Sequence, residues 1–244
     1  MRIEFVGHST TVISEKNKIV VTDPVINPKI KILKRKTDAC LKEDVYTSAS
    51  CILISHSHYD HLDIYTLSKF KRDIPVIVPW EIGKIVRKAK LKEIYELNWN
   101  EEISIKGLKI LSLPAIHWSS RFFKWGGGWC SYLIIMDGGN IYFAGDTSYG
   151  PHFSEIGKRF RIHLALLPVG AIRPSFIMKK YHMCPNEAIR AFFELNAKFF
   201  IPIHWGAYKV ALEDVNEPVE ILKTHPLYDK NRMIILKPGE SVEL

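Results

Sequence analysis

The sequence lacks the features of several protein classes. It has four cysteines among 244 residues, and no two of them form a CxxC pair. That usage disfavours a disulfide-stapled secreted domain, so we expect free thiols in a reducing compartment. No apolar run approaches the roughly 20 residues that a membrane-spanning helix needs. The stretch from Met1 to Val6 enters an apolar segment at once, without a signal-peptide layout, and makes the cytoplasm the expected location.

Other absences narrow the chemistry and the architecture. There is no GxSxG motif of a serine hydrolase and no well-placed catalytic cysteine pattern. There is also no repeat at a solenoid period and no low-complexity tract. With 47% hydrophobic residues, the chain can bury a substantial core, and we expect one hydrolase domain over residues 1–244.

Positive charge is abundant, with a formal net charge of +8 and an isoelectric point near 9.2. Its densest cluster lies in the weakly periodic stretch 27–50, which we interpret as an exposed loop or lid; the cluster is Lys29, Lys31, Lys34, Arg35 and Lys36. Such a cluster fits either a solvated loop or contact with an anionic membrane surface. Nucleic acid is the weaker partner, because the other lysines are dispersed and no separate RNA-binding arm is evident.

Apolar runs and turn residues predict strands first, and then helices between strands, in both halves of the chain. The expected strands are 3–6, 10–14, 18–22, 51–54, 76–79, two within 102–113, 131–136, 141–144, 164–167, 199–203 and 233–236. The expected helices are 60–70, 81–90, 185–196 and a weaker one at 218–224. This order predicts an α/β (α+β) domain with sheets packed together and helices outside.

The stretch 55–63, Ser-His-Ser-His-Tyr-Asp-His-Leu-Asp, has the densest chemistry in the chain. It follows the apolar run Cys51 to Ile54 and holds three histidines and two aspartates. Imidazole suits zinc, iron and similar metals, and carboxylates add charged oxygen ligands. A solvated surface loop would explain one histidine more easily than three alternating with an acid, so we expect a metal site.

Further ligands are expected at the ends of other buried strands. His117, Asp146 and His204 each follow an apolar run and precede a break, as His56 does. A fold that aligns strand ends would bring these side chains to one edge. His8 also follows a strand, but its spacing fits no ligand pair, and it is expected behind the ligands or in a structural role.

These residues resemble the metallo-β-lactamase fold pattern, in which HxHxDH is followed by a lone histidine, a Gly-Asp pair and a late histidine. The matching residues are His56, His58, Asp60, His61, His117, Asp146 and His204. Further motifs resemble one branch, N-acylphosphatidylethanolamine phospholipase D and its prokaryotic relatives. They are Gly7-His8-Ser9-Thr10, Thr22-Asp23-Pro24, His117-Trp118 with Arg121, Ala144-Gly145-Asp146-Thr147, His182 before Pro185-Asn186-Glu187-Ala188, and Ile203-His204-Trp205-Gly206. The resemblance covers nearly the whole chain and implies a four-layer αββα sandwich with metals at one sheet edge.

The resemblance also implies roles for these residues. It implies two divalent metal ions, zinc first and iron or manganese as alternatives, and a metal-bound hydroxide as nucleophile. The first ion would be held by His56, His58 and His117, and the second by Asp60, His61 and His204, with Asp146 as a bridge. Asp60, Asp146 and His182 are the catalytic candidates. Asp63 is expected to fix a ligating imidazole from behind, or else to serve as an acid at a helix N-terminus.

The expected substrate contacts follow His117. Aromatic residues gather there around three glycines, namely Trp118, Phe122, Phe123, Trp125 and Trp129, and they are either core or a flexible apolar lip. Arg121 is expected to hold a phosphate, and Arg173, shifted from the position in the related branch, is a second candidate contact.

The leading hypothesis is hydrolysis of a phosphodiester in a small-molecule or lipid substrate. A lactonase of the ascorbate-6-phosphate lactonase type and, less favoured, a nuclease are the alternatives. Peripheral membrane contact and homo-oligomers both remain open.

Overall fold

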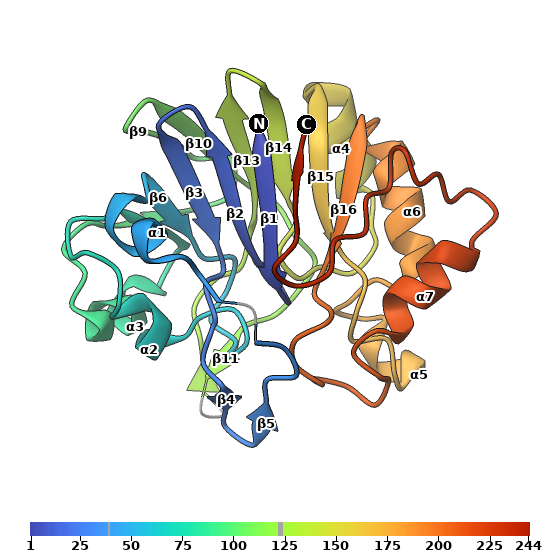
Figure 1. Ribbon diagram of the computed structural model, residues 1–244, viewed down its shortest axis with the longest axis horizontal. Coiled ribbons are helices and arrows are strands. Elements are labelled where there is room, and N and C mark those ends of the chain that lie inside the picture. The colour runs from blue at the N-terminus through green and yellow to red at the C-terminus, as the bar shows by residue number, and fades with distance from the viewer. Residues whose placement is uncertain (39, 122–123) are drawn as a thin grey trace.

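The computed structural model describes residues 1–38, 40–121 and 124–244, and two sheets dominate it (Figure 1). The first has the order β17-β1-β2-β3-β6-β7-β8. Its strands are β1 (Arg2–Gly7), β2 (Thr10–Glu15), β3 (Lys18–Thr22), β6 (Cys51–Leu53), β7 (Val76–Pro79), β8 (Ile94–Leu97) and β17 (Ser241–Glu243). The second has the order β16-β15-β14-β13-β10-β9. Its strands are β9 (Glu102–Ile105), β10 (Leu108–Leu113), β13 (Ser131–Met136), β14 (Gly139–Phe143), β15 (Ile162–Pro168) and β16 (Phe199–Ile203).

Helices cover the outer faces of both sheets (Figure 1). The first sheet is covered by α1 (Glu43–Ser48), α2 (Ile64–Leu67), α3 (Gly83–Val86) and the 3₁₀ turn Arg87–Ala89. The second is covered by α4 (His152–Arg159) and α6 (Pro185–Glu194), with α7 (Glu217–Thr224) packed on α6. The short helix α5 (Ser175–Met178) and the small hairpins β4 (Lys29–Ile30) with β5 (Leu33–Lys34) and β11 (Ser120–Arg121) with β12 (Lys124–Trp125) lie below the sheets. The αββα sandwich expected from the sequence is confirmed.

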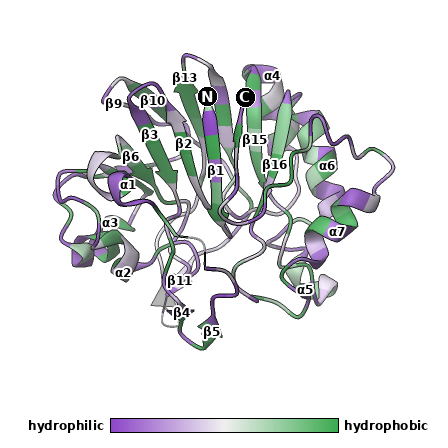
Figure 2. Ribbon diagram, viewed as in Figure 1, coloured by the Kyte–Doolittle hydropathy of each residue, from purple (hydrophilic) through white to green (hydrophobic). Residues whose placement is uncertain are grey.

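Alternation along the central strands explains these layers. In and after β6, Cys51 and Leu53 point into the core between the sheets, while Ile52 and Ile54 point into the core beneath α1 to α3. A strand buried on both faces is apolar throughout, as the hydropathy colouring of the inner strands shows (Figure 2). None of the described helices has the length and apolar character of a membrane span.

The parallel pairing of strands determines where the expected ligand residues lie. Strands β3, β6 and β7 run parallel in one sheet, and β14, β15 and β16 run parallel in the other. Because parallel strands end at the same edge, the residues that follow β3, β6, β14 and β16 all emerge at the lower edge in Figure 1. β10 is antiparallel to β13, which is antiparallel to β14, so the end of β10 joins them.

Three expected elements differ from the structure. The helix expected over 60–70 is only α2, because Leu62 N–H donates to the His58 carbonyl (2.8 Å) in a turn and Asp63 then caps the helix. The strand expected at 233–236 is absent; Met233 makes an isolated bridge to Phe200, and β17 closes the first sheet against β1. The stretch 27–50 contains the β4–β5 hairpin and α1 rather than a loop throughout.

Candidate metal centre

The structure brings all seven expected ligands together at the shared sheet edge. They reach it from four loops, after β6, β10, β14 and β16, at the strand ends that the sequence indicated. Five of the seven, His56, His61, His117, Asp146 and His204, are buried, and His58 and Asp60 lie against them. Their polar atoms therefore interact with one another inside the protein.

Three histidines form the first group. His58 Nδ1 lies 2.9 Å from His56 Nε2 and 3.3 Å from His117 Nε2. Two nitrogens that bind one tetrahedral zinc ion at about 2.0–2.1 Å are about 3.3 Å apart. The spacing of this trio fits a single ion of that size.

The second group is built from Asp60, His61 and His204. The Nε2 atoms of His61 and His204 lie 3.7 and 3.6 Å from Asp60 Oδ2. The same two nitrogens lie 3.2 and 3.1 Å from Asp146 Oδ2. Asp146 Oδ2 is also 3.9 Å from the Nε2 atoms of both His56 and His117. Asp146 thus lies between the two groups, where a bridging carboxylate is expected.

Unsatisfied polar atoms show that this donor set fits cations. His61 Nε2, His204 Nε2 and Asp146 Oδ1 are buried without a hydrogen-bond partner. Buried polar atoms are almost always paired, because leaving one unpaired costs about 1–3 kcal/mol. Ligand atoms that converge in this way, and that have the chemistry of zinc, iron or manganese sites, are satisfied when metal is bound.

The pKa shifts of the histidines also indicate a site that fits cations. Burial lowers the pKa of His204, but the carboxylates of Asp146 and Asp60 outweigh burial and raise that pKa to about 9. The pKa of His61 is likewise raised well above its usual value, because the same carboxylates and Asp23 outweigh burial. Burial and neighbouring imidazoles hold the pKa of His56 far below its usual value. The carboxylates of Asp60 and Asp146 thus stabilise positive charge beside them. Without metal, the charged forms of His61 and His204 provide that charge.

Several groups behind the ligands fix the imidazole orientations. The carboxylate of Asp23 accepts from His61 Nδ1 (2.6 Å), from Ser55 N–H (2.7 Å) and from Ser55 Oγ (2.6 Å). His117 Nδ1 donates to the Tyr181 carbonyl (2.9 Å). Both contacts place the proton of the neutral imidazole on Nδ1, so that Nε2 is the nitrogen left for a metal. The sequence predicted no role for Asp23, although it follows β3 just as the ligands follow their strands.

His8 and His182 flank the centre. His8 Nε2 lies 2.9 Å from Asp60 Oδ2 and clusters with Asp60, His61 and His204. His182 Nδ1 lies 3.7 Å from Asp146 Oδ2, on the open side of the centre. Burial lowers the pKa of His182 to about 4, and this side chain is neutral at pH 7.

Three expected residues have contacts away from a ligand or substrate. Asp63 takes the second of its two expected roles, because its carboxylate accepts from Thr66 N–H (2.9 Å) and caps α2. Arg121 Nη1 donates to the carbonyls of Ser57 and Leu62 (both 2.9 Å), so this nitrogen braces the ligand loop instead of facing a substrate. Arg173 is exposed and paired with Glu217, since its Nε donates to Glu217 Oε1 (3.0 Å).

Of the expected aromatic lip, the part that the structure describes places Trp118 at the cavity. Trp118 lines the cavity and packs edge-on against His58, with ring centroids 4.9 Å apart. Trp129 instead packs against Trp80 and Trp99. Phe122 and Phe123 lie outside the described residues, as does the side chain of Trp125.

A cavity of about 480 Å³ opens onto the centre. One wall holds His58, Asp60, Asp146, His182 and His204. The facing wall is largely apolar and comes from the β4–β5 hairpin, α5 and the 205–212 loop, with Ile30, Ile32, Leu33, Met178 and Val210. The cavity therefore offers a charged end and an apolar end to one ligand.

Comparison with known proteins identifies relatives along the whole chain. Residues 18–205 match the model of the beta-lactamase superfamily domain. An uncharacterized protein of Mycobacterium tuberculosis is 29% identical over 267 residues, which cover 100% of this chain and 68% of that protein. The mitochondrial N-acyl-phosphatidylethanolamine-hydrolyzing phospholipase D of Saccharomyces cerevisiae is 35% identical over 184 residues, 70% of this chain and 39% of that protein. A metal-dependent hydrolase of Pyrococcus furiosus is 29% identical over 247 residues, covering 100% of both chains.

Solved structures share the fold at low identity. Igni18, a metallo hydrolase of Ignicoccus hospitalis, superposes with a TM-score of 0.73 at 22% identity, covering 99% of this chain and 97% of the other. A possible metal-dependent hydrolase of Veillonella parvula superposes with a TM-score of 0.82 at 14% identity, covering 100% and 99%. These likenesses extend over both sheets and their helices.

Proposed function

The chain belongs to the beta-lactamase superfamily and is a metal-dependent hydrolase, and we propose that it holds a dinuclear centre and cleaves phosphodiesters that carry an apolar group. The observation that carries the proposal is the cavity, in which four of the seven clustered ligand-type side chains, His58, Asp60, Asp146 and His204, face an apolar wall. We propose zinc as the resident metal, since imidazole nitrogens dominate the donor set.

Two groups of ligand-type residues would hold the two ions. His56, His58 and His117 would hold one, and Asp60, His61 and His204 the other, with Asp146 shared. When bound, such ions lower the pKa of water from about 15.7 to about 7 and stabilise negative charge on a phosphoryl oxygen. Asp60 and Asp146 offset only two of the four positive charges, so the centre favours an anionic substrate group.

Other residues would orient the substrate. His182 lines the cavity beside Asp146 and is neutral at pH 7, so it is placed to hydrogen-bond a substrate oxygen. Trp118 and the β4–β5 hairpin would bury an acyl or similar apolar chain, which positions the reacting bond. The yeast relative is named for hydrolysis of such a lipid, which supports this choice of substrate.

A substrate panel on metal-defined protein tests the proposal. Protein stripped and reloaded with zinc, iron or manganese is assayed on an N-acylphosphatidylethanolamine in mixed micelles, a short-chain phosphodiester, an aliphatic lactone and an RNA oligonucleotide. We expect the highest kcat/KM on the acylated phosphodiester. A lactone opened far faster than either phosphodiester would favour the lactonase alternative, and preferential RNA cleavage would favour a nuclease.

A pair of tryptophan variants tests the apolar wall in the same assay. Trp118→Ala should lower kcat/KM for the long-chain phosphodiester about tenfold, the effect of removing a partly buried aromatic contact, and should affect the short-chain one much less. Trp99→Ala is the matched control, because Trp99 is exposed but packs against Trp80 and Trp129 away from the cavity lining. Equal losses on both substrates with Trp118→Ala would show that Trp118 does not contact the apolar chain of the substrate.

A further inference from the structure

Exposed apolar side chains gather around the mouth of the cavity. Ile32 is 87% exposed at the tip of the β4–β5 hairpin, Phe176 is 68% exposed on α5, and Leu212 is 69% exposed. Ile32 itself lines the cavity, while Phe176 and Leu212 each stand two residues from the lining residues Met178 and Val210. A single exposed apolar side chain is ordinary, but several from separate segments around one opening indicate an interaction surface.

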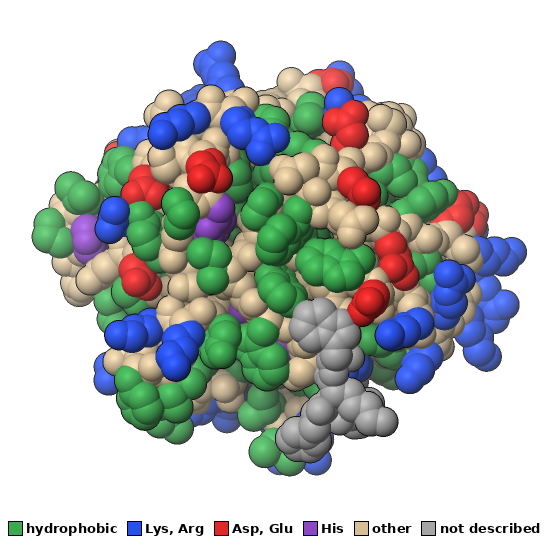
Figure 3. Space-filling model, turned by 180° about the vertical axis from the view of Figure 1, so that it is seen from behind, with side chains coloured by type: hydrophobic (Ala, Val, Ile, Leu, Met, Phe, Trp, Pro, Cys, Tyr) green, Lys and Arg blue, Asp and Glu red, His purple; other side chains and the backbone are tan. Residues whose placement is uncertain are grey.

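These segments lie together on one edge of the molecule. Leu212 N–H donates to the Arg173 carbonyl (3.4 Å), which joins the 205–212 loop to the start of α5. The β4–β5 hairpin and α5 both project below the sheets in Figure 1. From behind, apolar side chains lie along the same lower edge next to Lys and Arg side chains (Figure 3).

Positive charge predominates in the segments that carry these apolar tips, although exposed Asp38 and Asp214 lie just beyond two of them. Segments 27–37, 170–183 and 205–212 contain no aspartate or glutamate. They carry seven exposed lysines, namely Lys29, Lys31, Lys34, Lys36, Lys179, Lys180 and Lys209. The arginines of these segments are engaged within the protein: Arg35 donates to the Val6 and Val25 carbonyls (2.7 and 2.8 Å), and Arg173 pairs with Glu217. The lysines are therefore the main cations that this edge presents to a partner, with Lys31 also lying over the Tyr59 ring, 4.1 Å from its centroid.

Apolar tips surrounded by lysines match the surface of an anionic bilayer. Aliphatic and aromatic tips enter the boundary between headgroups and acyl chains, while lysines remain at the level of the lipid phosphates. Nucleic acid would use the lysines but would leave the projecting Ile32 and Leu212 without an apolar partner. A second protein copy would bring seven more lysines against these seven, which like-charge repulsion disfavours.

We propose that this docking rim, formed by Ile32, Phe176, Leu212 and the seven lysines, binds anionic lipid bilayers and presents the cavity mouth to the membrane. The inference rests on the proposed function, because it supplies the route by which a lipid phosphodiester reaches the centre. The binding itself requires no turnover and can be measured separately.

Vesicle flotation of the metal-loaded protein tests the proposal. Vesicles of phosphatidylglycerol with phosphatidylcholine are compared with vesicles of phosphatidylcholine alone, at low and high salt. We expect binding to the anionic vesicles only, weakened by salt because lysine attraction is screened.

Phe176→Asp with Leu212→Asp should weaken that binding about tenfold or more, since charges replace the inserted tips. Neither residue lines the cavity, so hydrolysis of a water-soluble short-chain phosphodiester should be retained.

The matched control is Phe193→Asp with Leu227→Asp, two exposed apolar residues of the α6–α7 side. The control should bind vesicles as the wild type does. Equal binding to neutral and anionic vesicles, no binding at all, or equal losses in both double variants would overturn the docking rim. Conversion of a dimer to a monomer by Phe176→Asp with Leu212→Asp, without vesicle binding by the wild type, would assign the surface to a second copy. Vesicle binding without phosphodiester hydrolysis would refute the proposed function and leave the rim standing.

Discussion

Asp23 shows how much of the centre depends on a residue that binds no metal in the proposed arrangement. Its carboxylate is fully buried, and burial raises its pKa even though His61 and Ser55 both bond to it. By accepting from His61 Nδ1, it fixes the tautomer in which Nε2 has a free lone pair. The same carboxylate holds Ser55 at the start of the ligand loop.

Replacing Asp23 with asparagine should therefore weaken metal binding at one of the two positions. The amide has one acceptor oxygen in place of two, so its NH₂ group faces either the Ser55 N–H donor or His61 Nδ1, and an NH₂ group facing His61 favours the wrong tautomer. We expect a loss of about 10–100-fold in affinity for one ion, measured by competition with a chelator.

Asp63→Ala is the control for this substitution. Asp63 is in the same loop region but caps α2, so its loss should cost about 1 kcal/mol of folding stability and leave metal affinity unchanged. If Asp63→Ala lost metal and Asp23→Asn did not, the roles assigned to these two aspartates would be reversed.

The raised pKa values predict that metal binding releases protons. His204, with a pKa of about 9, holds its proton at pH 7.5 when no metal is bound, and the raised pKa of His61 favours the charged form of that ring as well. Metal binds the neutral imidazole, so the His204 proton must leave and affinity should rise with pH up to about 9.

Calorimetry in buffers of different ionisation enthalpy counts these protons. We expect at least about one proton released per chain at pH 7.5, from His204, and fewer well above pH 9, where His204 is largely neutral already. A proton count near zero at pH 7.5 would show that the aspartates do not hold His61 and His204 in their charged forms.

At the scale of elements, the ligand loop 55–63 is held by contacts from distant strands. Arg121, in β11, bonds to the carbonyls at both ends of the stretch 57–62, and its guanidinium lies 4.0 Å from the centroid of the Tyr59 ring. Lys31 of the hairpin lies over the same ring, 4.1 Å from its centroid. A loop without long regular structure thus keeps its ligands in place through side chains from β11 and β4–β5.

Arg121→Met should consequently lower activity on every substrate alike. It removes two charged hydrogen bonds that hold the loop, and we expect kcat/KM to fall about tenfold or more for a phosphodiester and for a neutral lactone, with weaker metal binding. Arg173→Met is the matched control and should change neither quantity, because Arg173 pairs with Glu217 at the surface. A loss confined to phosphodiesters would restore Arg121 as a phosphate contact.

Elements with strong apolar patterns could be predicted from the sequence, and those that depend on capping or pairing could not. β6, β14 and β16 are buried runs, and the ligands at their ends followed from the same pattern. The helix expected over 60–70 was too long because the turn at His58 and the cap at Asp63 start α2 late. The partners of Asp23 and Arg121 were not predictable, because they depend on which strands lie side by side.

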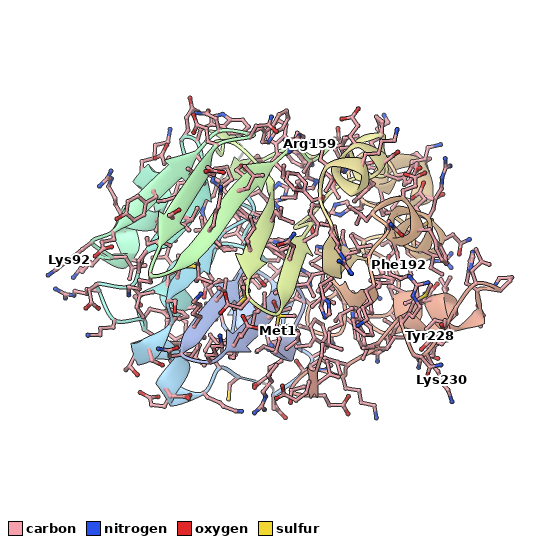
Figure 4. All side chains as sticks on the ribbon, turned by 90° about the horizontal axis from the view of Figure 1, so that it is seen from above. Met1, Lys92, Arg159, Phe192, Tyr228 and Lys230 are labelled. Carbon is pink, nitrogen blue, oxygen red and sulfur yellow. The ribbon has the colours of Figure 1, made fainter. Side chains whose placement is uncertain are left out.

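At the scale of the whole molecule, the two sheets act as a frame that aligns strand ends from both halves of the chain. Met1 and Leu244 are joined by hydrogen bonds in both directions, and β17 closes the first sheet beside β1. Seen from above, the two sheets form two layers that face each other. Phe192, of α6, lies on the outer side of the second sheet (Figure 4). The opposite, lower edge is left to the metal centre, the cavity and the docking rim, so chemistry and substrate access share one side of the frame.

The central claim is that this edge holds two metal ions per chain, and elemental analysis of reconstituted protein tests it most directly. Protein stripped with a chelator, reloaded with zinc and freed of excess ion by gel filtration should contain two zinc ions per chain, because seven ligands exceed what one tetrahedral ion takes. His58→Ala with His117→Ala should reduce the count to one, by removing two of the first trio. A wild-type protein that retains at most one ion after reconstitution would contradict the dinuclear centre.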